Sequence, residues 1–419
     1  MTHLYSPDVR LPAACEISAA LLGFLIATAV PAHAGANVVT DWDEKSVVFV
    51  TAYIPGPMGS RAVAMVHLAM FDAVNSIEPR YRPYLGQLSA PPGTSKEAAA
   101  AAAAGAILAA LASNNDKAQN EIRDATTAYL STLPDGDAKS NGIKVGENIA
   151  AKILAARAND RAGAADDYRP LTTPGIYVPT QLTVGSKWPD MTPFVIAKPS
   201  QFRPEPPVSL KSKEWAADYN ELKDYGGKTG SKRSPEQTET ARFWLVVGPP
   251  AYQPFARQLV MKKNMSVVDS ARLMALVSVA LSDALTAVFD AKYHYNFWRP
   301  VTAIRNGDTD DNPATERMAT WEPIDNTPLH PEYPCAHCIS SGAVEAVIEV
   351  ALGSAEIPEI ALTSPTAPGI THRWTNLNAF SEEVANARIW AGFHYRTSTV
   401  TGMRSPPRHR EHRLRYSLA

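Results

Sequence analysis

The chain has 419 residues, of which 45% are hydrophobic, with 40 Lys and Arg against 42 Asp and Glu. This composition is that of a globular protein and excludes the disordered and collagen-like classes. The net charge of −2 lacks the basic surplus of nucleic-acid-binding proteins, so we expect no nucleic-acid partner. Three cysteines are too few for a scaffold held together by disulfides.

The first 34 residues have the parts of a secretory signal. Arg10 precedes an apolar run of 14 residues from Ile17 to Val30, and Ala32-His-Ala34 follows it. This order is typical of a signal peptide, and the run is short for a membrane span, although a short N-terminal anchor stays open. We therefore predict a signal peptide at 1–34, an exported protein that is periplasmic or secreted, and no transmembrane span in the mature chain.

Helical patterns follow along most of the chain. Periodicity or helix-forming composition predicts helices at 60–77, 96–112, 117–130 and 143–158. Capping signals at Ser234 and Ser266 begin two more. The helix from Ser266 to about Lys292 is apolar on nearly every face, so we predict a buried central helix, with a transmembrane span as the alternative.

Strand-like alternation is scarce, and the region Pro170–Pro207 carries nine prolines. A segment of this length is either a functional lid or a disordered linker, and its aromatic residues favour an ordered loop. We predict a single all-α domain over 35–402, a helical bundle with long proline-rich loops.

The first group of chemically informative residues is Lys292 to Pro300. Lys292 and Arg299 lie seven residues apart, which would place both on one face of a continuous helix. Pro300 excludes Arg299 from helical geometry, so we expect the helix to end nearby. Two cations in this apolar setting favour an anion site over a pair of solvated charges. Asp283 and Asp290 precede them and either orient a histidine or a cation, or have a structural role.

The second group is His330-Pro-Glu-Tyr-Pro-Cys-Ala-His337-Cys338, followed by an apolar helix at about 339–352. His337 would lie at a helix N-terminus, where free amides favour an anion, and it titrates in the range needed to transfer a proton. A structural or capping histidine is the alternative. For Cys335 and Cys338, a structural disulfide or two packed thiols is favoured over a zinc site or a redox pair.

The third group is Ser381 to Arg396. Ser381 is predicted to cap a helix that carries Arg388. His394 follows Arg388 by six residues, which is about 120° away from the same helix face. The two side chains would meet at one ligand only through the length of the arginine or a local break, for which Gly392 is the candidate.

Together the three groups resemble the vanadium-dependent haloperoxidases and the related type 2 phosphatidic acid phosphatases. The resemblance covers residues 283–400 and lies in the order Lys292, Arg299-Pro300, Pro334-x-x-His337, then Arg388 with His394. It implies an all-α bundle that holds a tetrahedral oxyanion, with Lys292, Arg299, Cys335, Ala336 and Arg388 binding its oxygens. His394 would ligate vanadium or attack phosphorus, and His337 would be the acid–base partner.

The sequence departs from the family pattern in two places. Pro-Ser-Gly-His is replaced by Pro334-Cys335-Ala336-His337, so a weak thiol donor replaces a hydroxyl, and a disulfide to Cys338 would remove it. The end of the chain from Arg404 carries five arginines and one glutamate after an abrupt change of composition. We predict a basic tail at 403–419, either frameshifted or truncated, or a natural tail that binds an anionic surface.

The resemblance implies an enzyme that uses vanadate, hydrogen peroxide and a halide to halogenate a small organic acceptor. Hydrolysis of phosphate esters through a phosphohistidine, with phosphate as the substrate group, is the alternative. A third hypothesis is a catalytically impaired protein that binds the oxyanion without turnover. The motif Phe297-Trp298-Arg299-Pro300 favours the haloperoxidase branch.

Overall fold

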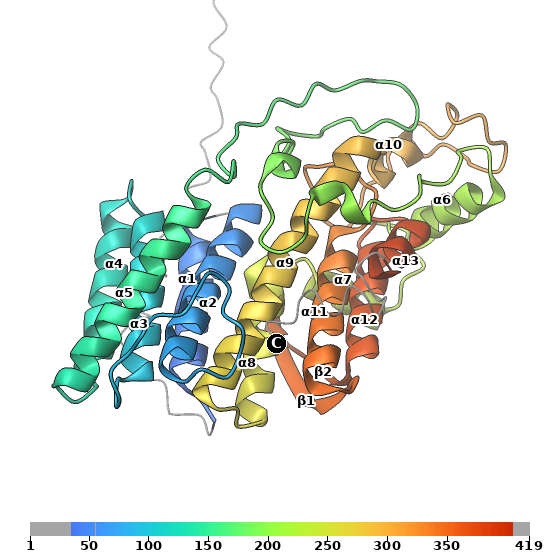
Figure 1. The fold of residues 1–419 in the computed structure, drawn as a ribbon. Helices are drawn as coiled ribbons and strands as arrows, with labels where there is room; N and C mark the ends of the chain where they lie inside the picture. The colour runs from blue at the N-terminus through green and yellow to red at the C-terminus, as the bar shows by residue number, and fades with distance from the viewer. Residues whose placement is uncertain (1–34, 55, 405–419) are drawn as a thin grey trace, which may run out of the picture. The chain divides into compact units, whose positions relative to one another are not determined.

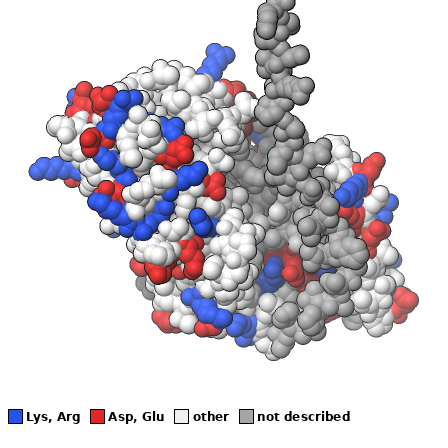
Figure 2. Space-filling view, turned by 180° about the vertical axis from the view of Figure 1, so that it is seen from behind, with Lys and Arg blue, Asp and Glu red and all other residues white. Residues whose placement is uncertain are grey.

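The computed structural model describes residues 35–54 and 56–404. The predicted signal at 1–34 and the tail from 405 onward therefore lie outside the described residues. Helices make up most of the described part, which confirms the predicted all-α helical bundle (Figure 1). Charged side chains of both signs are interspersed on the face that Figure 2 shows, in keeping with the small net charge.

Five helices form the N-terminal part of the bundle; the sequence predicts three of them to within three residues, and the helix predicted from 143 begins six residues earlier, at Asp137. Their bounds are α1 (Val38–Tyr53), α2 (Pro57–Ile77), α3 (Lys96–Leu111), α4 (Asp116–Ser131) and α5 (Asp137–Arg157). The alanine-rich α3 is buried because α5 approaches it closely. A Cβ atom at Gly146 would lie 2.3 Å from the carbonyl oxygen of Ala99, so only glycine allows this spacing.

The long helix α9 (Val267–Tyr295) lies between the N-terminal and C-terminal helices in Figure 1. Ser266 caps it by accepting a hydrogen bond from the Asp269 amide, as predicted. Within the described residues, α9 is the helix that is long and apolar enough to cross a membrane, but 89% of its most apolar window is buried inside the fold. It packs against α2 and α11, which confirms the predicted buried central helix.

The remaining helices complete the fold. Their bounds are η1 (Trp188–Asp190), η2 (Pro199–Phe202), α6 (Lys213–Tyr225), α7 (Pro235–Phe243), α8 (Pro249–Lys262), α10 (Pro300–Arg305), α11 (Ala336–Leu352), α12 (Leu377–Trp390) and α13 (Arg396–Arg404). The predicted capping box at Ser234 is present, with Gln237 reaching back to the Ser234 amide. Residues 403 and 404, which we assigned to the tail, instead end α13.

One antiparallel hairpin was not predicted. Strand β1 (Glu356–Ser364) pairs with β2 (Ala367–Asn376), and Ile360 lies opposite Trp374. The register is irregular between Glu356 and Ile360, which disturbs the two-residue alternation that marks a strand in a sequence. The hairpin packs against α8 with Ile360 and Trp374 buried.

The proline-rich segment is an ordered loop, as its aromatic residues suggested. The Asp283 carboxylate on α9 accepts hydrogen bonds from the amides of Phe194, Val195 and Ile196 at 2.7, 2.8 and 3.0 Å. Asp290 pairs with Arg203 at 2.9 Å. Of the roles that the sequence left open for these two aspartates, the structure supports the structural one, because both fasten this loop to α9.

Candidate oxyanion site

Lys292 is buried near the C-terminal end of α9. Its Nζ donates hydrogen bonds to the carbonyl oxygens of Pro331 at 2.9 Å and Glu332 at 2.7 Å. Burial lowers the pKa of Lys292 well below its ordinary value, and the charge of Arg299 lowers it further. An anion that binds beside Lys292 would stabilise its charged form.

Arg299 is not on the same helix as Lys292. Helix α9 ends at Tyr295 because Asn296 adopts the left-handed conformation, with φ of 51°, and Arg299 is the extended residue before Pro300 and α10. The expected end of the helix is therefore confirmed, and a shared helix face does not bring the two cations together. Both instead bind the same loop, since Arg299 Nε donates to the His330 carbonyl at 2.8 Å.

The rest of the Arg299 guanidinium contacts two histidines. Nη1 lies 3.2 Å from Nε2 of His394 and donates to the Phe393 carbonyl at 3.0 Å, while Nη2 lies 3.0 Å from Nδ1 of His330. Burial lowers the pKa of Arg299 to about 10. Arg299 thus links the loop at 330–332 to the turn that carries His394.

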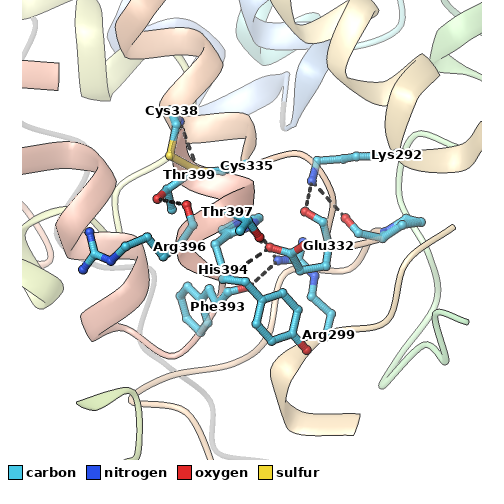
Figure 3. A network of polar contacts seen from close by, with 12 residues as sticks. Lys292, Arg299, Glu332, Cys335, Cys338, Phe393, His394, Arg396, Thr397 and Thr399 are labelled. Carbon is cyan, nitrogen blue, oxygen red and sulfur yellow. Dashed lines mark hydrogen bonds and ion pairs between the residues drawn. A yellow bond between two sulfur atoms is a disulfide. The ribbon is translucent and has the colours of Figure 1, made fainter. Parts of the chain in front are cut away.

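The loop also supplies a carboxylate that meets His394. Glu332 is fully buried, and its Oε1 lies 2.7 Å from Nδ1 of His394 (Figure 3). The same oxygen accepts the Tyr395 amide at 3.2 Å. With Nδ1–H donating to Glu332, Nε2 of His394 keeps a lone pair, which agrees with the Arg299 N–H group beside it.

A turn after α12 places His394. Ser381 does not cap this helix as predicted, because Asn376 does so and Ser381 is buried inside it. Gly392 has φ of 78°, and the amides of Phe393 and His394 both lie within hydrogen-bond distance of the Arg388 carbonyl, at 3.1 and 3.3 Å. This glycine-dependent helix end is the local break that the spacing of Arg388 and His394 required.

Arg388 is the third buried cation. Its Nη1 donates to the Trp244 carbonyl at 2.5 Å, and its guanidinium lies 4.8 Å from the centre of the Phe393 ring. Among the residues that the structure describes, the buried Nε of Arg388 finds no hydrogen-bond partner. Burial lowers the pKa of Arg388 to about 9. An unpaired buried N–H group of this kind is available to a ligand oxygen.

His337 lies in the first turn of α11, as predicted, with Cys335 as the capping residue. The His337 Nε2 lies 3.0 Å from the Val246 carbonyl, and Tyr252 donates to the His337 carbonyl at 3.1 Å. Burial lowers the pKa of His337 well below its ordinary value, and Arg388, Lys292 and Arg299 lower it further. His337 is therefore close enough to the three cations to feel their charge, while its ring nitrogen binds the backbone.

Cys335 and Cys338 form a disulfide in the structure, which corrects the predicted role of Cys335 as a thiol donor (Figure 3). The bonded sulfur has no S–H group, and the pair packs against Ala385 and Met403. The disulfide also leaves no thiolate for the zinc site that the sequence had left open. Ala336 borders a cavity beside His337, and its amide stays a predicted oxyanion donor.

The buried charges of the site favour an anion. Three cations, Lys292, Arg299 and Arg388, lie among neutral histidines with one nearby carboxylate, Glu332, whose pKa burial raises to about 7. The described residues contain no group of three His, Cys, Asp or Glu side chains that could hold a metal cation. The N–H groups of the three cations fit a multiply charged oxyanion such as vanadate or phosphate.

Sequence reasoning missed two members of this arrangement. Glu332 and His330 both lie in the quoted motif, but neither was assigned a role. Glu332 carries no signal of its own, because other charged residues such as Glu322 and Asp325 lie in the same proline-rich loop and the sequence does not show which of them is buried. His330 shows no periodicity or spacing to Arg299, so its contact depends on the path of the loop.

Known proteins resemble this chain in sequence and in fold. The family model described as the VCPO second helical-bundle domain matches residues 272–406. Vanadium chloroperoxidase from Curvularia inaequalis is 26% identical over 366 residues, which cover 69% of this chain and 60% of that relative. The chain thus spans about 60% of the length of this curated relative.

Solved structures agree at the level of the fold. A bacterial vanadium-dependent iodoperoxidase gives a TM-score of 0.74 at 21% identity, covering 88% of this chain and 93% of its own. The holo form of a bacterial vanadium-dependent chloroperoxidase gives 0.70 at 18% identity, covering 89% and 96%. The fold defines a helical-bundle class of protein, here with three buried cations near a buried histidine. Within that class, this chain resembles the vanadium haloperoxidases, through the family match at residues 272–406, the curated relative and the fold of the solved structures.

Proposed function

We propose that this chain is a vanadate-dependent haloperoxidase. The reaction would be H₂O₂ + X⁻ + H⁺ → HOX + H₂O, where X⁻ is a halide, and the hypohalous acid would halogenate an organic acceptor. The observation that carries the proposal is a group of buried cations near His394: Arg299 Nη1 lies 3.2 Å from its Nε2, and the charges of Lys292 and Arg388 add to that of Arg299 in lowering its pKa.

The cations would hold the oxyanion. Three fixed positive groups offset its charge, and the buried, unpaired Nε of Arg388 offers one hydrogen bond without breaking another. When bound, vanadate would activate hydrogen peroxide towards attack by a halide. The disulfide removes the thiol donor, and the Cys335 amide binds the Ser398 carbonyl, so the amides of Ala336 and His337 would be the donors on the side of α11.

His394 and His337 would have different roles. His394 presents Nε2 to the oxyanion, since its Nδ1–H group is engaged by Glu332 at 2.7 Å. His337 would hold or transfer a proton, and the lowered pKa that burial gives it favours the neutral ring, which can accept one. Both roles are carried over from the family motif and stay predictions for this chain.

Phosphate-ester hydrolysis is the second candidate, and the contact between Glu332 and His394 is the observation that favours it. A carboxylate that orients Nδ1–H makes Nε2 a better nucleophile, as in other histidine-based sites. His394 would then attack phosphorus and form a phosphohistidine.

Export is proposed on the sequence at 1–34 alone, and the basic tail after Arg404 is likewise retained from the sequence. The vanadate proposal is tested with purified protein that is first freed of bound oxyanion and then titrated with orthovanadate. Bromide-dependent bromination with peroxide should appear in proportion to bound vanadate. Release of phosphate from an ester without bromination would favour the second candidate.

A further inference from the structure

A largely apolar cavity of about 390 Å³ opens beside the candidate site. Its walls come from α1, α8, α9 and the proline-rich loop, and include Val50, Ile54, Val184, Leu281 and Leu285. The volume falls in the range of about 300–1,000 Å³ that is usual for small-molecule sites. Binding of a hydrated ion against such a wall is not favourable. Binding of an apolar molecule is favourable, because it removes apolar surface from water.

The lining of the cavity includes two histidines of the candidate site, His330 and His337. His330 is in turn 3.0 Å from Arg299, and His337 lies within the field of all three cations. The cavity wall is also continuous with His330, since the rings of Phe289 and His330 are 5.1 Å apart. A molecule in the cavity would therefore present one end to the place where the oxyanion is expected.

The walls of the cavity are held in place. The Val184 amide donates to the Leu329 carbonyl at 2.8 Å, and Tyr293 donates to the Val184 carbonyl at 2.7 Å. On the opposite side, Pro249 and Pro250 begin α8 directly after Gly248, which has φ of 70°. Proline in the first turn of a helix is rigid and has no N–H group that needs a partner. The cavity is thus largely pre-formed, which lowers the entropic cost of binding.

We propose that this cavity binds a neutral, apolar organic molecule with an oxidisable aromatic ring, and places that ring beside His330 and His337. The inference rests on the proposed function, which makes this molecule the acceptor. The step would be HOX + R–H → R–X + H₂O, in which a C–X bond forms, the O–X and C–H bonds break, and the oxygen leaves as water. Halogenation would then favour a bound acceptor over a dissolved one.

Binding is tested first, with protein free of vanadate and with N-phenyl-1-naphthylamine, a neutral probe that fluoresces in apolar surroundings. We expect saturable binding by the wild type and displacement by 1-methoxynaphthalene. The Leu285→Asp and Leu285→Trp variants should bind the probe at least tenfold more weakly, because one makes the wall polar and the other fills the cavity. Val350→Asp and Val350→Trp, at an exposed apolar residue near the far end of α11, are the matched controls and should bind like the wild type.

The second test compares bromination of 1-methoxynaphthalene with that of a sulfonated phenol dye, which is charged and soluble. In Leu285→Asp the kcat/KM ratio of the first acceptor to the second should fall about tenfold. Equal probe binding by wild type and both Leu285 variants would overturn the cavity site, and an unchanged ratio would overturn the acceptor role. A wild type that brominates neither acceptor would contradict the proposed function, while probe displacement by 1-methoxynaphthalene would still support the cavity.

Discussion

The carboxylate of Glu332 and the imidazole of His394 form a buried pair, with 2.7 Å between Oε1 and Nδ1. The pair comes from two segments 62 residues apart that Arg299 also bridges. Because Glu332 takes the Nδ1–H group, Nε2 is the ring nitrogen that keeps a lone pair, and Arg299 Nη1 lies 3.2 Å from it. In the proposed function, this contact would set which ring nitrogen of His394 faces the oxyanion.

Replacing Glu332 tests this arrangement. Glu332→Leu should lower kcat about 10- to 100-fold, the usual cost of losing such an orienting partner. Glu332→Gln should lose less, since an amide oxygen can still accept from Nδ1–H. Nitrogen NMR of His394 in the vanadate-free protein should show the Nδ1–H tautomer in the wild type and in Glu332→Gln. Equal activity of the leucine and glutamine variants would refute the orienting role.

The two histidines of the motif should respond differently to removal. His394→Ala should abolish turnover, because the nitrogen that faces the oxyanion is lost. His337→Ala should slow turnover about 10²- to 10⁴-fold, the range for a general acid–base, with a smaller loss of orthovanadate affinity by calorimetry. His294→Ala, at an exposed residue of α9, is the matched control. Full activity in His394→Ala would contradict the assignment.

The disulfide between Cys335 and Cys338 can be tested by alkylation of the cysteines. Under denaturing, non-reducing conditions an alkylating reagent should label neither Cys335 nor Cys338, and after reduction it should label both, as mass spectrometry can show. Closing so short a loop is worth about 2 kcal/mol in the chain-entropy model, so reductant should lower the free energy of unfolding by up to that amount. Cys335→Ala/Cys338→Ala should not respond to reductant. Labelling of both residues before reduction would show that the thiols are free.

Asp283 predicts a pH dependence of stability. Burial raises the pKa of Asp283 to about 6, against 3.8 as its ordinary value, and outweighs the three amides that favour the ionised form. A carboxyl group with a raised pKa in the folded state binds its proton more tightly there, so its contribution is complete below pH 3.8 and is lost as pH rises to about 6.

The stability of the wild type relative to Asp283→Asn should therefore fall between pH 4 and 6, by about 3 kcal/mol. Urea unfolding of both proteins across this range measures the difference. Asp308→Asn, at an exposed residue, should follow the wild type. If the wild type instead becomes more stable relative to Asp283→Asn as pH rises, the raised pKa of Asp283 in the folded state is contradicted.

The sequence predicts the fold better than the geometry of the site. Lys292, Arg299, Arg388 and His394 could be chosen from spaced motifs, and α9 from its apolar composition. Glu332 could not, because its role depends on the loop that folds back between α9 and α12. The hairpin β1–β2 was missed since its irregular register hides the alternation, and Asn376 rather than Ser381 caps α12 because the second strand ends there.

The apolar cavity also could not be predicted from the sequence. Its walls combine residues from α1, α8, α9 and the loops at 184 and 329, which no single periodic pattern contains. The sequence did indicate that the proline-rich segment is ordered. In the structure, Val184 of that segment lines the cavity.

The most direct test of the central claim is bromination by the purified protein with bromide and hydrogen peroxide, measured before and after orthovanadate is added. The account predicts activity that depends on vanadate, saturates with it and disappears in His394→Ala. No bromination with vanadate bound, together with phosphate release from an ester by the same protein, would contradict it.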